Sequence, residues 1–217
     1  MGYQDTLTAF RRGDNALAKQ LAEADLQDAI ESSNVGAQVD AVCMLARVAL
    51  RDGDLSEVTA RASEGRRLAR VAGDRRLERM PLHLLAVAAR LEGRSDESRT
   101  LYRESIALNE SLDESRMAAL EHRNLAYVEL HAGDVEAAKE LIAESRQRLV
   151  GVDDPMLGPY LTFDDAVLAA VDGDNEEAVR LLVEADAQFR TLAIVPDPDD
   201  AAEMAALRQA LGVDAHE

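Results

Sequence analysis

The chain has 217 residues, 47% of them hydrophobic, and a formal net charge of −18. The apolar content suffices for a continuous core, and the single cysteine, Cys43, excludes an intramolecular disulfide framework. The negative charge repels phosphate, so general nucleic-acid binding is not expected, and no apolar run approaches the roughly 18 residues of a membrane span. The N-terminal residues include acid and arginine where a secretory signal is apolar, so the sequence predicts a cytoplasmic protein.

Five glycines recur at intervals of 40 residues, and aspartate follows all of them except the third; they are Gly13, Gly53, Gly93, Gly133 and Gly173. A fixed period of this length is typical of a stacked array of one structural unit. Apolar residues on both sides of each glycine are spaced by three and four positions, which predicts helices and no strands. Glycine would end the first helix in the left-handed conformation, and the residues after it would cap the second helix.

In chain order, the expected helices span residues 2–12, 14–33, 36–52, 54–72, 79–92, 94–112, 115–132, 134–150, 156–172, 174–193 and 198–211. Pro81 predicts that the fifth helix begins near Met80 or bends there, and Gly73 ends the fourth. Asp197 and Pro198 would begin a last helix that covers the exposed face of the fifth repeat. The chain is thus predicted to be one domain over 1–217. Its repeats would span about 1–34, 35–74, 75–113, 114–154 and 155–195, with a capping helix at 197–212.

Small residues recur at three fixed distances from the glycines, where they would let paired helices approach closely. The position seven before the glycine holds Thr6, Ala46, Ala86, Ala126 and Ala166. The position five after it holds Ala18, Val58, Ser98, Ala138 and Ala178, and the position twelve after it holds Asp25, Gly65, Ser105, Ser145 and Ala185.

This pattern resembles the tetratricopeptide repeat, and the resemblance covers the chain from Gly2 to about Val195. The period of 40 exceeds the usual length of about 34, which is similar to long-repeat members of the family in some bacterial regulators. The resemblance implies an all-α, right-handed superhelix (an α-solenoid) of about five helical hairpins plus a C-terminal capping helix.

The resemblance also implies a concave groove lined by the first helices, where members of the family contact their ligands. The corresponding stripe has 24 positions, with five of the chain's seven aromatic residues and with five arginines against one acid. Aromatic and arginine enrichment is typical of binding surfaces, and arginine suits carboxylates. The candidate groove residues are Arg47, Arg51, His83, Arg90, Arg123, Tyr127, His131, Tyr160 and Phe163.

A packing role is the alternative for the same stripe. Tyr3 and Phe10 would then seal the end of the array, and Tyr160 and Phe163 would pack under the last helix. Arginines can also lie over apolar surface without binding anything. The stripe of the fifth repeat has no charge, which suits contact with the last helix or with a second subunit.

The chain offers little that predicts chemistry. His83 and His131 lie on the stripe in neighbouring repeats, where they could approach each other or a carboxylate, whereas His122 is interpreted as a packed core residue. No nucleophile and orienting acid accompany them, and the acidic clusters lack the spacing of a calcium loop. Cys43 is interpreted as a small apolar residue. No enzyme, metal site or cofactor is therefore expected.

The first function hypothesis is a module that holds a protein or peptide, with an acidic segment, in the groove. The alternative is a domain that senses a small ligand or a signalling peptide and acts on a partner protein. Neither nucleic acid nor membrane is an expected partner, and the terminal repeats are candidates for a homodimer contact.

Overall fold

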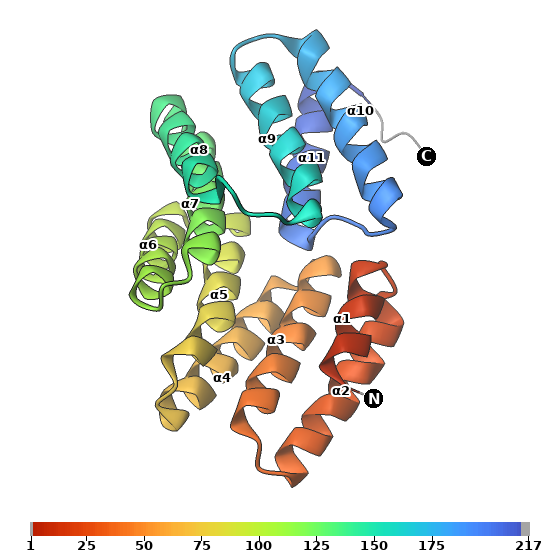
Figure 1. Ribbon diagram of the computed structural model, residues 1–217, viewed down its shortest axis with the longest axis vertical. Helices are drawn as coiled ribbons and strands as arrows, with labels where there is room; N and C mark the ends of the chain where they lie inside the picture. Colours follow the sequence, from red (N-terminus) through yellow and green to blue (C-terminus); the bar gives the residue numbers. More distant parts are fainter. Residues whose placement is uncertain (1, 214–217) are drawn as a thin grey trace. The chain divides into compact units, whose positions relative to one another are not determined.

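The computed structural model describes residues 2–213, and in that range it contains helices and no strand (Figure 1). The α-helices are α1 (Tyr3–Arg11), α2 (Asn15–Glu31), α3 (Val35–Arg51), α4 (Leu55–Ala72), α5 (Arg79–Leu91), α6 (Ser95–Ser111), α7 (Ser115–His131), α8 (Val135–Leu149), α9 (Gly158–Val171), α10 (Asn175–Leu192) and α11 (Pro198–Leu211). Short 3-10 helices, η1 (Arg75–Glu78) and η2 (Pro155–Leu157), precede α5 and α9. Each expected helix is present with its ends within two residues of the prediction, so the all-α helical-repeat fold is confirmed.

The turns between paired helices follow the sequence prediction. The five periodic glycines all have φ between 74° and 83°, the left-handed region that an L side chain adopts only at a cost. Where aspartate follows the glycine, its carboxylate accepts a hydrogen bond from a backbone N–H of the next helix, as Asp54 does from Glu57 and Asp134 from Ala137. Arg94 stands at this position in the third repeat, and α6 has no side-chain cap. The 40-residue period is therefore a repeated turn and cap.

The small residues of the repeat pattern are buried. Ala46, Ala86, Ala126 and Ala166 have no exposed surface, as predicted. In the first repeat the pattern contains Thr6 and Asp25 instead of two small apolar residues, and the Thr6 hydroxyl donates a 2.7 Å hydrogen bond to Asp25. This bond joins α1 to α2 and satisfies the polar groups that the departure from the pattern introduces.

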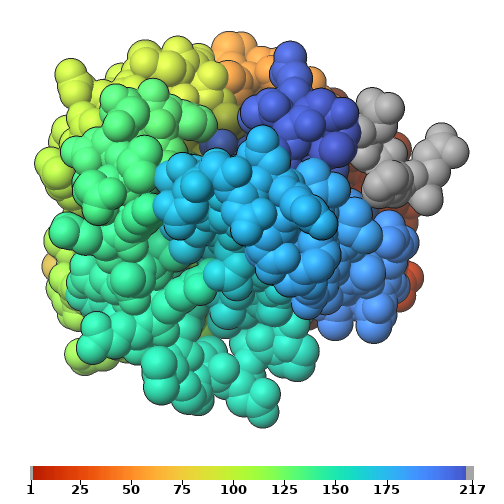
Figure 2. All heavy atoms as spheres, turned by 90° about the horizontal axis from the view of Figure 1, so that it is seen from above, coloured from red at the N-terminus to blue at the C-terminus, as the bar shows by residue number. Residues whose placement is uncertain are grey.

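The chain divides into two compact units, one of residues 1–10 and 14–150 and the other of residues 11–13 and 151–217. In the first unit consecutive helices pack against each other from α2 to α8. In the second unit α9 and α10 form a hairpin, and α11 packs against both. The atoms of α10 and α11 lie next to each other in the space-filling view (Figure 2). The prediction of one domain over the whole chain stays a prediction.

Candidate functional site

Two arginines of α3 lie against an aromatic ring of α1. The guanidinium carbons of Arg51 and Arg47 are 3.8 and 4.3 Å from the centre of the Phe10 ring. Arg51 also donates a 2.8 Å hydrogen bond from Nη1 to the carbonyl oxygen of Phe10. Stacking of this kind fixes the plane of a guanidinium while it remains charged.

A second group, in which two arginines lie near a tyrosine ring, joins α5 to α7. The guanidinium carbons of Arg123 and Arg90 are 5.2 and 5.5 Å from the centre of the Tyr127 ring. Arg123 also donates a 3.2 Å hydrogen bond from Nη2 to the Tyr127 hydroxyl. We refer to the two groups together, Phe10 with Arg47 and Arg51 and Tyr127 with Arg90 and Arg123, as the arginine–aromatic face.

The two groups differ in exposure. Arg47 and Arg51 are half-buried, whereas Arg90 and Arg123 are 4% and 3% exposed. The sequence-based expectation of a surface positive patch therefore describes the Phe10 group better than the enclosed Tyr127 group.

His83 and His131 have different surroundings. His83 lies on α5, with its Nδ1 3.2 Å from Oε2 of the buried Glu121 on α7, so it approaches a carboxylate as hypothesised. The other oxygen of Glu121 accepts a 3.0 Å hydrogen bond from Ser105 of α6. His131 is exposed in the last turn of α7. The His83 contact thus joins three helices.

The two groove candidates of the second unit differ in exposure, since Tyr160 is half-buried and Phe163 is buried. Phe163 has no exposed surface. The Tyr160 ring packs edge-on against Phe189 at 5.1 Å, and its hydroxyl accepts a 3.2 Å hydrogen bond from the backbone N–H of Asp197. Burial raises the pKa of Tyr160. The hydrogen bond between Asp197 and Tyr160 places this ring beside the start of the last helix, whereas the packing of Phe163 under that helix stays a prediction.

Cys43 is buried, and burial raises the pKa of its thiol, with a further increase from the neighbouring Asp40. A thiol that stays protonated is a poor nucleophile. The interpretation of Cys43 as an apolar core residue therefore agrees with its surroundings.

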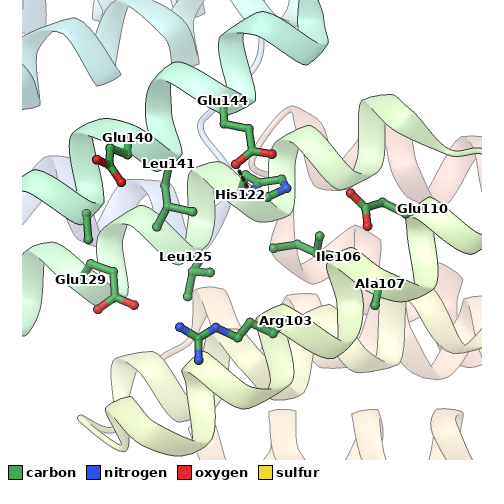
Figure 3. A pocket seen from close by; sticks show the side chains of 11 residues that line it. Arg103, Ile106, Ala107, Glu110, His122, Leu125, Glu129, Glu140, Leu141 and Glu144 are labelled. Atoms are coloured by element: carbon green, nitrogen blue, oxygen red, sulfur yellow. Dashed lines mark ion pairs between the residues drawn. The ribbon is translucent and has the colours of Figure 1, made fainter.

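A pocket of about 480 Å³ lies in the first unit between α6, α7 and α8 (Figure 3). Its lining includes Arg103, Ile106, His122, Leu125, Glu140 and Glu144. His122 is 8% exposed, and neither of its ring nitrogens has a hydrogen-bond partner among the described residues. Nδ1 is 3.6 Å from Oε2 of Glu144, which is outside hydrogen-bonding distance. Sequence reasoning placed His122 in the core and did not identify this pocket.

Burial lowers the pKa of His122 and outweighs the opposing effect of the Glu144 carboxylate, while the nearby Arg148 lowers it further. The imidazole is therefore neutral at pH 7, with one nitrogen as donor and the other as acceptor. Within residues 2–213 no group of three or more His, Cys, Asp or Glu side chains could hold a metal ion. No helix in that range is long and apolar enough to cross a membrane.

No protein-family model and no curated protein sequence matches this chain. A solved structure, the crystal structure of BtubC (BKLC) from P. vanneervenii, is similar in fold, with a TM-score of 0.60 at 19% sequence identity. The match covers 93% of this chain and 83% of that one. At this identity the likeness supports the helical fold alone.

Proposed function

We propose that this chain is a scaffold module that binds an acidic segment of a protein or peptide at its arginine–aromatic face. The observation that carries the proposal is that two aromatic rings are each accompanied by two arginines. A guanidinium whose plane is already fixed loses little freedom when it binds a carboxylate, and it presents two parallel donors to it. The resemblance to the tetratricopeptide repeat supports the same proposal.

The half-buried Phe10 group is the first contact in this proposal, because Arg47 and Arg51 retain exposed surface. The chain carries 42 acids against 24 lysines and arginines, so an acidic partner is repelled elsewhere and is drawn to a region where arginines gather. The partner would thus be oriented by charge and held by carboxylate–guanidinium pairs.

The test is binding of a fluorescein-labelled glutamate-rich peptide, followed by fluorescence anisotropy at increasing salt. The double variant Arg47→Gln/Arg51→Gln should weaken binding by about 100-fold, since a charge-assisted hydrogen bond contributes about 1.5–3 kcal/mol. Binding to the unsubstituted protein should weaken as salt screens the contact.

The matched control is Arg67→Gln/Arg75→Gln, which removes the same charge from exposed positions on α4 and η1. It should leave the affinity nearly unchanged, and circular dichroism should show equal helicity in both variants. Equal loss in the two variants would mean that the peptide responds to net charge alone, and the proposed site would be wrong.

A further inference from the structure

His122 departs from the repeat at a position that other repeats fill with apolar side chains. The position eleven residues before the periodic glycine holds Val42 in the second repeat and Leu82 in the third, and both are buried. The fourth repeat holds a histidine there, which is also buried and whose two ring nitrogens lack hydrogen-bond partners in the described part of the chain. An unsatisfied buried polar group destabilises a fold, whereas leucine would fit the pattern. A bound ligand that completes the hydrogen bonds of His122 would account for the presence of histidine at this position.

The charged side chains beside the imidazole favour a ligand that carries a cationic hydrogen-bond donor. Nη2 of Arg148 is 2.8 Å from Oε1 of Glu144 and 2.9 Å from Oε1 of Glu110. One guanidinium therefore serves two carboxylates, and it contacts Glu110 through Oε1, at a side chain that is 45% exposed. Oε2 of Glu144 is the oxygen nearest to His122. A neutral imidazole nitrogen and two carboxylate oxygens together match the three donors of a primary ammonium group.

Away from His122, the pocket is apolar at its centre and polar again at its opposite end. Figure 3 shows Leu125 and Leu141 facing each other between His122 on one side and Glu140 on the other. Arg103 of α6, Glu129 of α7 and Glu140 of α8 also line the pocket, and the positive charge of Arg103 acts on the Glu129 carboxylate. An ammonium group at the His122 end would thus be followed by a hydrocarbon chain, and by groups of both charges at the Arg103 end.

We propose that the pocket between α6, α7 and α8 binds an aliphatic ammonium group of the lysine type. The ammonium donates to His122, Glu144 and Glu110, and its methylene chain lies on Leu125 and Leu141. Arg103 and Glu140 then face the carboxylate and the amine of a free amino acid, or the backbone around a lysine of a partner protein. No residue of the arginine–aromatic face lines this pocket, so the proposal does not depend on the peptide-binding function.

The experiment is isothermal titration of the full chain with L-lysine and, as the matched ligand, L-norleucine, which has the same chain length without the side-chain ammonium. Lysine should bind and norleucine should bind at least tenfold more weakly. The source of the ammonium is distinguished by Nα-acetyl-lysinamide, which mimics a lysine within a protein. Tighter binding of free lysine identifies a free amino acid, and tighter binding of the mimic identifies a protein lysine.

The variant His122→Leu restores the apolar residue of the third repeat. It should raise the melting temperature and weaken lysine binding at least tenfold, a combination that a purely structural histidine would not produce. Glu184→Gln, at the position in α10 that corresponds to Glu144, should leave both quantities unchanged. Absence of lysine binding to the unsubstituted protein, or equal binding of lysine and norleucine, would overturn the proposal, as would full lysine binding by His122→Leu.

Discussion

The fourth hairpin (α7–α8) and the fifth (α9–α10) are the same 40-residue unit, but they differ in the hydrogen bonding of one polar side chain. Eleven residues before the glycine, the fifth hairpin has Thr162, whose hydroxyl donates a 3.1 Å hydrogen bond to Gln188 of the second helix. Gln188 in turn lies 3.4 Å from Glu184. In the fourth hairpin the same position holds His122, and the residue corresponding to Gln188 is Arg148, which binds Glu144 and Glu110. One polar group is satisfied within its hairpin, and the other is left without a hydrogen bond.

At this position the fifth hairpin supplies a hydrogen-bond partner for its polar side chain, and the fourth hairpin does not. A half-buried polar side chain that forms its hydrogen bond within the hairpin costs little and needs no ligand. A buried imidazole whose potential partner is held by an arginine costs stability, and such conflicts tend to mark functional positions. The two hairpins are therefore internal controls for each other.

The largest expected effect comes from removing residues 197–217, because the fifth hairpin has α11 as its cover. Met204 of α11 is 1% exposed, and Arg208 makes a 2.6 Å ion pair with Asp186 of α10. Their loss should lower the free energy of unfolding by about 3 kcal/mol and promote self-association. Urea unfolding and light scattering measure the two effects. A truncated protein that stays monomeric with an unchanged melting temperature would show that α11 is not a cap.

The next largest effect is expected from overpacking the positions where small residues let paired helices approach. Ala126→Leu in the fourth hairpin and Ala166→Leu in the fifth add three carbons at positions with no exposed surface. Each should cost roughly 1–3 kcal/mol in urea unfolding. Because the two alanines occupy the same place in the repeat, the losses should be similar. A loss in one hairpin alone would mean that the crossings are not equivalent.

A third expectation concerns an ion pair that the fourth hairpin forms and the fifth lacks. Glu129 of α7 is 7% exposed and accepts hydrogen bonds of 2.8 and 2.9 Å from Arg99 of α6, whereas Ala169 is the corresponding residue of α9. Glu129→Gln should cost about 1–2 kcal/mol in urea unfolding. Asp96→Asn, which removes the exposed partner of the same arginine, should change stability little.

The ion pair between Arg99 and Glu129 also predicts how the stability of the protein changes with pH. The hydrogen bonds from Arg99 lower the pKa of Glu129, so the folded state binds this proton less readily than the unfolded chain. The stability that the pair contributes is present above the unfolded pKa, about 4.3, and is lost as pH falls through the lower folded pKa. Between pH 7 and pH 3 the difference in stability between the unsubstituted protein and Glu129→Gln should shrink. A constant difference would contradict this assignment.

The smallest expected effect is that of Thr162→Val, which removes the hydroxyl that the fifth hairpin satisfies. Loss of one neutral hydrogen bond at a half-buried position should cost about 0.5–1 kcal/mol, measured by urea unfolding. His122→Leu is expected to change stability in the opposite direction. Changes of the same sign at both positions would remove the distinction between the hairpins.

The helices and their turns could be predicted from the sequence because they depend on local chemistry repeated five times. A glycine with positive φ ends one helix, and an aspartate accepting a backbone hydrogen bond begins the next. The buried alanines were predictable for the same reason, since they recur at a fixed spacing from the glycine. The signal for His122 was also present in the sequence, because Val42 and Leu82 occupy its position in other repeats.

The candidate site was predictable only as a set of residues on one stripe. That Arg47 and Arg51 both lie on Phe10, and Arg90 and Arg123 on Tyr127, depends on how neighbouring helices pack, which the period of a single helix does not contain. The sequence by itself determined the hairpin and its repetition, because backbone conformation and apolar spacing are local properties. Only the tertiary structure decided which polar groups find partners, because Glu144 is held by Arg148 and leaves His122 unsatisfied through contacts among three helices.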